Sequence, residues 1–320
     1  MPKEATHWIA ARQTAARLAG TGWGEAALRC PNALQMGAVF PDLPSYLAGS
    51  SEQARQAAAL GNRYHGAGGE DTYDLLRALL VSLREEDEPA HRAFLVGVAS
   101  HLCVDAVFHP WVYYETGNYY DPDPARRTQA VRDHRRFEGL LDLAICGNLA
   151  KARSCRARTI WQNLERPPEA LLEWAARHQE PAAAGEVLTA ANGKFLWVQS
   201  LIAHPAAARV AGGLEPLLPA GCRELTALFL REPAARDLER LRGRLEYRNP
   251  VSGESRIASV EELLGEGVEA GAAACRGMER AIGRGSASDF AEHGPSLNFG
   301  LVAADVAKAR FFASPAFFAR

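Results

Sequence analysis

The chain has 320 residues, 48% of them hydrophobic and 23% charged, which is enough apolar material for one large buried core. Its formal net charge of −2 excludes the strongly basic surface on which binding to duplex nucleic acid usually depends. No uninterrupted apolar stretch approaches the ~18 residues of a membrane span, and charged residues interrupt positions 1–20, where a signal peptide would have its apolar core. We therefore expect a cytoplasmic protein without a transmembrane segment, or a secreted one if a leader has been removed.

Helical periodicity dominates the sequence, because runs rich in Ala, Leu, Arg and Glu repeat apolar positions every three to four residues. In chain order, helices are predicted over residues 72–86, 89–108, 125–149, 169–178, 182–202, 223–230, 234–245, 260–282 and 297–312. Proline and glycine interrupt the pattern at 41–44, 66–69 and 119–124, and Tyr247 and Arg256 flank a short turn that indicates a hairpin. The sequence predicts an all-α fold with one predominantly helical domain over residues 1–320, in which residues 151–320 can form a C-terminal helical extension.

Three groups that can bind a metal stand four residues apart at the end of the 89–108 helix: His101, Asp105 and His109. Positions i, i+4 and i+8 of a helix drift by only about 40° per step, so the three side chains project from one face. Chance would produce such a triple on the order of once in a hundred such chains. Pro110 follows directly and disfavours helical geometry at the residue before it. We therefore predict a helix end or kink that aims His109 at a different metal from His101.

Other candidate ligands lie on either side of this triple. His134 and Glu138 form a second i, i+4 pair in the 125–149 helix, and His7, Asp42 and His65 lie upstream. Each also has a simpler interpretation. The pair can be a solvated surface ion pair, Asp42 can cap a turn, His65 can interact with a helix dipole, and His7 can be an ordinary half-exposed histidine.

The order and spacing of these residues resemble a known family. In chain order they are His7, Asp42, His65, His101-x-x-x-Asp105, His109 and His134-x-x-x-Glu138. This series is similar to that of the zinc-dependent phospholipase C family, which is related to the fungal single-strand-specific nucleases. The resemblance covers roughly the first 140 residues, and it implies a nearly all-helical fold that holds a cluster of two or three zinc ions.

The resemblance also implies a role for each residue. Asp42, His65, His101 and Asp105 would hold one zinc, and His109, His134 and Glu138 would hold a second. His7 would hold a third, with Asp105 bridging it to the first. Asp42 would lie against the metal-bound water as the general base. Family members with the full trinuclear site use the amino group and carbonyl of an N-terminal tryptophan, whereas His7 here follows six residues that include no tryptophan.

Zinc favours imidazole nitrogen and carboxylate oxygen as ligands, and it activates water for attack on phosphorus. We therefore expect a metal-dependent phosphodiester hydrolase of the phospholipase C type, in which metal-bound hydroxide attacks the phosphorus of a phospholipid head-group ester. Two alternatives stay open. One is a zinc-dependent nuclease or nucleotidase that uses the same metals, and the other is a non-catalytic, metal-stabilised protein that binds a phosphorylated ligand or a partner.

Two groups of aromatic residues have uncertain roles at this level. The first, Trp111, Tyr113, Tyr114, Tyr119 and Tyr120, follows the ligand triple and can either line a substrate pocket, for example against a cationic head group, or fill the core. The second, Phe311, Phe312, Phe317 and Phe318, can either contact a lipid interface or pack as a tail on the core.

Overall fold

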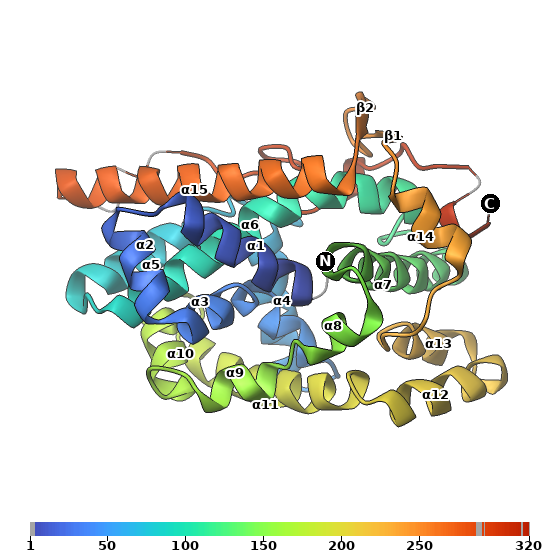
Figure 1. Ribbon diagram of the computed structural model, residues 1–320, viewed down its shortest axis with the longest axis horizontal. Coiled ribbons are helices and arrows are strands. Elements are labelled where there is room, and N and C mark those ends of the chain that lie inside the picture. The colour runs from blue at the N-terminus through green and yellow to red at the C-terminus, as the bar shows by residue number, and fades with distance from the viewer. Residues whose placement is uncertain (1–3, 286–289, 291, 315, 320) are drawn as a thin grey trace.

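The computed structural model describes residues 4–285, 290, 292–314 and 316–319, and this part of the chain is mostly helical (Figure 1). Its elements are α1 (Glu4–Arg17), α2 (Gly22–Arg29), α3 (Pro31–Gly37), η1 (Phe40–Tyr46), α4 (Glu52–His65), α5 (Asp74–Glu85), α6 (Pro89–Thr116), α7 (Pro124–Cys146), α8 (Leu149–Ser154), α9 (Ala157–Gln162), α10 (Pro168–Ala176), α11 (Ala184–Ile202), α12 (Pro205–Leu214), η2 (Glu215–Leu217), α13 (Ala220–Thr226), α14 (Ala235–Leu241), β1 (Leu245–Arg248), β2 (Ser255–Ala258), α15 (Val260–Arg284), η4 (Val306–Lys308) and η5 (Phe317–Ala319). The predicted all-α class is confirmed.

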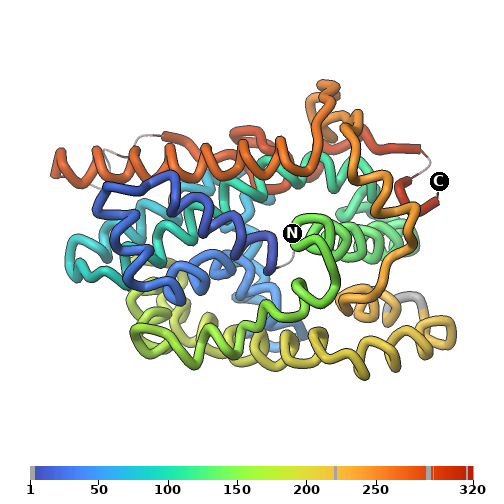
Figure 2. The backbone as a smooth tube through the Cα atoms, viewed as in Figure 1, coloured from blue at the N-terminus to red at the C-terminus, as the bar shows by residue number. Residues whose placement is uncertain are grey.

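Helix α6 lies at the centre of the fold and is buried along almost its whole length. Helices α1, α2, α3 and α15 pack against it, and α15 runs alongside it (Figures 1 and 2). By length and composition alone α6 could cross a membrane, but 94% of its most apolar window is buried inside the protein. That degree of burial is the pattern of a core helix.

The main hydrophobic core draws on three separate parts of the chain, within residues 8–106, 157–195 and 272–297. Trp8 and Phe94 from the first part, Trp174 and Phe195 from the second and Met278 from the third are each at most 1% exposed. Helices α10 and α11 therefore complete the same core that contains α6. Figure 2 shows this later part of the chain, in green and yellow, running beneath the blue N-terminal helices.

Helices α3 and α6 approach each other closely at two glycines. A Cβ atom on Gly97 would lie 2.1 Å from the carbonyl oxygen of Leu34, and one on Gly37 would lie 2.0 Å from the carbonyl oxygen of Phe94. Neither position can accept a side chain unless the helices move apart. Gly37 directly precedes Ala38, whose carbonyl accepts a hydrogen bond from His101 Nδ1 at 2.8 Å. The close packing of the two helices therefore also fixes the orientation of a candidate ligand.

Replacing Gly97 with alanine should lower the free energy of unfolding by about 3 kcal/mol, because the added methyl group forces α3 away from α6. Gly193 provides a matched control within α11, since a Cβ there meets nothing within 4 Å. Gly193→Ala should raise the free energy of unfolding by about 0.5–1 kcal/mol through the better helix propensity of alanine. Urea titration of both variants measures the difference, and equal effects would show that the helix contact is not tight.

Most of the predicted elements are present, with boundaries shifted by a few residues. The hairpin is confirmed, and Tyr247 pairs directly with Arg256 in the antiparallel ladder between β1 and β2. The helix predicted over 297–312 is wrong, because in the described part of this stretch the chain forms turns and the short η4. Gly300 and Ala303 take positive φ angles of 65° and 54°, which a continuous right-handed helix does not allow.

The predicted helix end at His109 is also wrong, since α6 continues past Pro110 to Thr116. The alternative, a kink in the helix at this point, stays a prediction. Proline lacks an N–H group, so it leaves the Ala106 carbonyl without its helical donor. The returning C-terminal segment passes at this point: a Cβ on Gly300 would lie 2.4 Å from the Ala106 oxygen and 3.4 Å from the Pro110 ring. The segment around Gly300 thus packs against the turn of α6 that contains Pro110.

Candidate metal centre

Five elements bring the eight predicted site residues into one region, where each is at most 7% exposed. Helix α1 carries His7, η1 carries Asp42, α4 ends at His65, α6 carries His101, Asp105 and His109, and α7 carries His134 and Glu138. Local sequence positions the first of these elements. Pro41 and Pro44 restrict η1 to a short 3₁₀ helix, and Gly66, with a φ of 63°, ends α4 immediately after His65.

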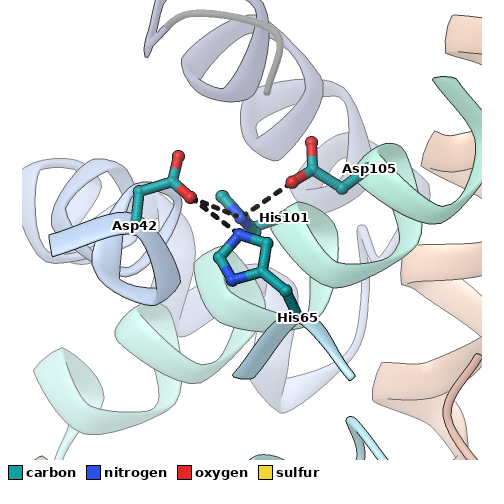
Figure 3. Close-up of side chains that lie close together, drawn as sticks. All are labelled: Asp42, His65, His101 and Asp105. Carbon is teal, nitrogen blue, oxygen red and sulfur yellow. Dashed lines mark hydrogen bonds and ion pairs between the residues drawn. The ribbon is translucent and has the colours of Figure 1, made fainter. Parts of the chain in front are cut away.

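The first cluster consists of Asp42, His65, His101 and Asp105 (Figure 3). His65 Nε2 lies 3.1 Å from Asp42 Oδ1. His101 Nε2 lies 3.5 Å from the same oxygen and 3.2 Å from Asp105 Oδ2. Each of the four residues offers one ligand atom, and these atoms all lie within 4.8 Å of one another.

Backbone carbonyls set the tautomers of the imidazoles in this cluster. His65 Nδ1 lies 2.7 Å from the Gly61 carbonyl oxygen, and His101 Nδ1 lies 2.8 Å from that of Ala38. A carbonyl only accepts, so each Nδ1 carries the hydrogen and each Nε2 of a neutral ring presents a lone pair. Those lone pairs face carboxylate oxygens, which repel them unless a proton or a cation lies between. Metal-binding histidines are commonly held in this way by an acceptor on their other nitrogen.

Two opposing effects, burial and the charges of neighbouring groups, set the pKa values in the first cluster. Burial lowers the pKa of His101, but the carboxylates of Asp42 and Asp105 outweigh it and raise the pKa to about 9. Burial raises the pKa of Asp42, but His101 and the hydrogen bond to His65 hold it below its ordinary value. The pKa of Asp105 is held well below its ordinary value, against burial, by His109, His101 and His7. Both aspartates are therefore ionised at neutral pH inside the protein.

The second cluster consists of His109, His134 and Glu138. His134 Nε2 lies 2.9 Å from Glu138 Oε1, and His109 Nδ1 lies 2.9 Å from the carbonyl oxygen of Leu297. Burial lowers the pKa of His109 to about 3 and also lowers that of His134, so both rings are neutral and able to coordinate. His134 and Glu138 are 4% and 6% exposed, which contradicts their interpretation as a solvated surface pair.

Asp105 lies between the two clusters, with His7 beside it. Its Oδ1 lies 3.3 Å from His7 Nε2 and 3.9 Å from His109 Nε2, while its Oδ2 faces His101. The rings of His7 and His101 stack with their centroids 4.0 Å apart. His7 is 1% exposed and is not an ordinary half-exposed histidine. A carboxylate with imidazoles on both oxygens suits the bridging role that the resemblance implies.

The donor groups fit zinc. Tetrahedral zinc with ligand bonds of about 2.0–2.2 Å places neighbouring donors about 3.3–3.6 Å apart, close to the 3.1–3.5 Å separations in the first cluster. Within the described residues, no hydrogen bond satisfies the buried Nε2 atoms of His101 and His109 or either oxygen of Asp105. Unsatisfied buried polar atoms are costly, and dications bound in the two clusters would satisfy these atoms. The second cluster offers three ligands, which is the number at catalytic zinc sites that keep one position open.

A cavity of about 440 Å³ opens onto both clusters. Five site residues line it, namely Asp42, His65, His109, His134 and Glu138. Its other walls are of two kinds. One is aromatic and polar, with Tyr46, Tyr113, Tyr119, Tyr120, Arg135 and Asn298, and the other is apolar, with Val198, Ile202, Leu225 and Leu228. A molecule bound there could contact both the candidate metal positions and hydrocarbon side chains.

The sequence alone did not reveal the residues after 150 that support the site. The Leu297 carbonyl orients His109, the Leu297 N–H donates to the His65 carbonyl, and Asn298 Oδ1 accepts a hydrogen bond from Tyr113 at 2.9 Å. These contacts are made by backbone atoms or by an ordinary amide, which leave no motif in the sequence. The apolar residues that line the cavity likewise look like core residues in the sequence, and only the fold shows that they line the same cavity as the clusters.

The structure shows where the two groups of aromatic residues lie. Tyr113, Tyr119 and Tyr120 line the cavity, whereas Trp111 is buried in a core cluster with Phe137. The closing phenylalanines do not form an exposed interface. Phe317 is 0% exposed and Phe318 lies half-buried under the guanidinium of Arg136.

Comparison with known proteins identifies the family. A family model described as zinc dependent phospholipase C matches residues 6–182, which is more than half of the chain and includes all eight site residues. No curated protein and no solved structure matches the chain at a significant level. The matched region, together with the two buried clusters, supports a metal-dependent hydrolase. The chain belongs to the zinc-dependent phospholipase C family.

Proposed function

We propose that this protein is a zinc-dependent phosphodiester hydrolase that releases the phosphorylated head group of a phospholipid. The observation that carries the proposal is the meeting of two ligand clusters with one cavity that apolar side chains also line. Zinc bound in the clusters would supply Lewis acidity toward phosphoryl oxygens and lower the pKa of water. A diacylglycerol ester has a phosphate to place at the clusters and hydrocarbon to place against the apolar wall.

Residues of this chain supply the remaining steps. Asp42 lines the cavity with an ionised carboxylate, so it can orient the attacking water and take up its proton. Arg135 is the one Lys or Arg side chain among the described lining residues, and it can contact a phosphoryl oxygen. The rings of Tyr113 and Tyr119, with centroids 4.8 Å and 5.1 Å from that of His134, lie where a cationic head group could rest on their faces.

The cavity charge favours a single phosphodiester over a polynucleotide. Zinc in the two clusters would balance the charges of Asp42 and Glu138, which leaves Glu4 and Arg135 as the other charged side chains among the described lining residues. One arginine offers little positive charge for the further phosphates of a polynucleotide. A zwitterionic lipid brings one phosphate and one compensating cation. We therefore place the lipid ahead of nucleic acid as the substrate.

The test compares substrates with zinc-loaded and chelator-treated protein. We expect release of phosphocholine from a monomeric short-chain phosphatidylcholine that disappears on chelation and returns with zinc. Single-stranded oligonucleotide should be cleaved far more slowly. Preferential cleavage of the oligonucleotide would instead support the nuclease interpretation. A zinc-loaded, folded protein that turns over neither substrate would support a non-catalytic binding protein.

A further inference from the structure

Exposed apolar side chains gather in one short part of the chain. Ten large hydrophobic side chains are exposed among the described residues, and six of them lie within residues 197–225. These six, which we call the apolar rim, are Trp197, Leu201, Val210, Leu214, Leu217 and Leu225. Trp197 is 63% and Leu217 is 81% exposed. Exposed apolar residues that gather in one region mark an interaction site more often than scattered single residues do.

The apolar rim has a regular arrangement on the helices. Trp197 and Leu201 are four residues apart on α11, and Val210 and Leu214 are four residues apart on α12, so each pair shares one helix face. Leu217 lies in η2 and Leu225 in α13. Figure 1 shows α11 and α12 following one another along an edge of the molecule, with α13 between α12 and α7. The residues of the rim are therefore carried by successive elements along this edge.

This border continues into the cavity of the candidate metal centre. Leu225 is 58% exposed and also lines the cavity. On α11, Val198 and Ile202 line the cavity and directly follow Trp197 and Leu201 of the rim. Helices α11 and α13 thus carry apolar side chains both on the outside of the protein and in the lining of the cavity.

The charges near the apolar rim indicate which kind of surface the rim can bind. Residues 187–214 contain no Asp or Glu, and their two charged side chains, Lys194 and Arg209, are exposed. The next acid, Glu215, is engaged by Arg132 at 2.7 Å and by Arg231. Glu224, the other acid of the segment that carries the rim, lies 3.7 Å from Arg135. The exposed cations Lys194 and Arg209 beside the apolar side chains are complementary to the surface of a bilayer that contains anionic lipid.

We propose that the apolar rim docks this protein on a phospholipid bilayer, with Trp197 and Leu217 inserted at the level of the head groups. Docking would place the mouth of the cavity next to the lipids, so that a substrate could enter along Leu225, Val198 and Ile202. The choice of a lipid surface rests on the proposed function. The rim lies outside residues 6–182, where the family match ends, so it is a feature of this chain beyond the matched region.

Tryptophan fluorescence tests docking without any turnover. The other five tryptophans are at most 6% exposed, so quenching by brominated lipid reports on Trp197. With vesicles of phosphatidylcholine and phosphatidylglycerol, we expect quenching in the full chain and its loss in Trp197→Phe. Quenching that persists in Trp197→Phe, or its absence in the parent protein while other surfaces bind the vesicles, would overturn the proposal.

Vesicle sedimentation tests the whole rim. The double variant Trp197→Ala with Leu217→Ser should bind the same vesicles at least about tenfold more weakly, because two apolar side chains no longer insert. Ile257→Ser is the matched control, since Ile257 is 54% exposed on β2, away from the rim, and binding should not change. Hydrolysis of a monomeric short-chain substrate should be equal in all three proteins, while hydrolysis of vesicle lipid should fall only in the double variant.

Two results would contradict the docking proposal. One is equal vesicle binding by the double variant and the parent protein. The other is a stable dimer of the parent protein, measured by light scattering, that the double variant converts to a monomer, because the rim would then be covered by a second copy. Loss of the proposed enzymatic function alone would not affect the binding measurements, so the two proposals fail separately.

Discussion

Zinc content should fall by at least one ion per chain when His101 is replaced with glutamine. Its Nε2 lies 3.5 Å from Asp42 and 3.2 Å from Asp105, so the substitution removes the imidazole from the middle of the first cluster. Removing a group that only orients a metal ligand weakens metal binding by about 10–100-fold. Removing the ligand itself should therefore weaken metal binding by more than about 100-fold. Elemental analysis after gel filtration measures the stoichiometry, which we expect to be at least two ions in the parent protein.

The matched control is His91→Gln, which makes the same substitution at another buried histidine. His91 Nδ1 bonds the Glu86 carbonyl at 2.8 Å, and its ring stacks on Trp174 at 4.3 Å. It belongs to neither cluster, so zinc content should stay at the parent level. The chelated parent protein and His101→Gln should both unfold at lower temperature than the zinc-loaded parent, since a ligand that binds only the folded state stabilises it. Unchanged zinc in His101→Gln would contradict the first cluster as a metal site.

Hydrolysis of a monomeric diester should fall by about 10²–10⁴-fold in Asp42→Asn, the typical contribution of a positioned proton acceptor. Asn keeps the size of the side chain and one oxygen that can coordinate, but it cannot accept the proton of the attacking water. The effect should appear in kcat more than in KM, because Asp42 lies among the candidate ligands, with its Oδ1 3.1 Å from His65 Nε2 and 3.5 Å from His101 Nε2. Steady-state kinetics with zinc in excess separates this loss from weakened metal binding.

Asp87→Asn controls for the loss of a carboxylate. Asp87 is a surface residue that pairs with Arg92, and its replacement should leave kcat within about twofold of the parent value. A fully active Asp42→Asn protein would remove Asp42 from the reaction and leave it as a structural neighbour of His65. Recovery of activity at excess zinc would assign Asp42 to metal binding alone.

Helix periodicity explains why much of this site was predictable. His101, Asp105 and His109 share a face because of their spacing alone, and α6 presents them together as that spacing predicts. His134 and Glu138 follow the same rule on α7. The hairpin is similarly local, since Tyr247 and Arg256 flank one short turn. Each of these features depends on contacts between residues close in sequence.

The features that could not be predicted depend on contacts between residues far apart in the sequence. A carbonyl oxygen such as that of Leu297 has no residue signature, and its segment looked helical because turns at Gly300 and Ala303 override the local pattern. The sequence left Phe317 open as a lipid-interface contact or a core residue, because its burial depends on packing with Phe137 from α7. Pro110 looked like a helix end because a proline rule applies to an isolated helix, and here the chain at Gly300 packs over the affected turn.

The contact between His109 and Leu297 has a consequence for how the protein matures. The two residues are 188 positions apart, and all eight candidate ligands leave the ribosome well before Leu297 does. A nascent chain can therefore collect metal at these ligands before it contains Leu297, the acceptor that holds the His109 ring. The finished geometry of the second cluster is thus reached only after the segment around Leu297 has folded back onto α6.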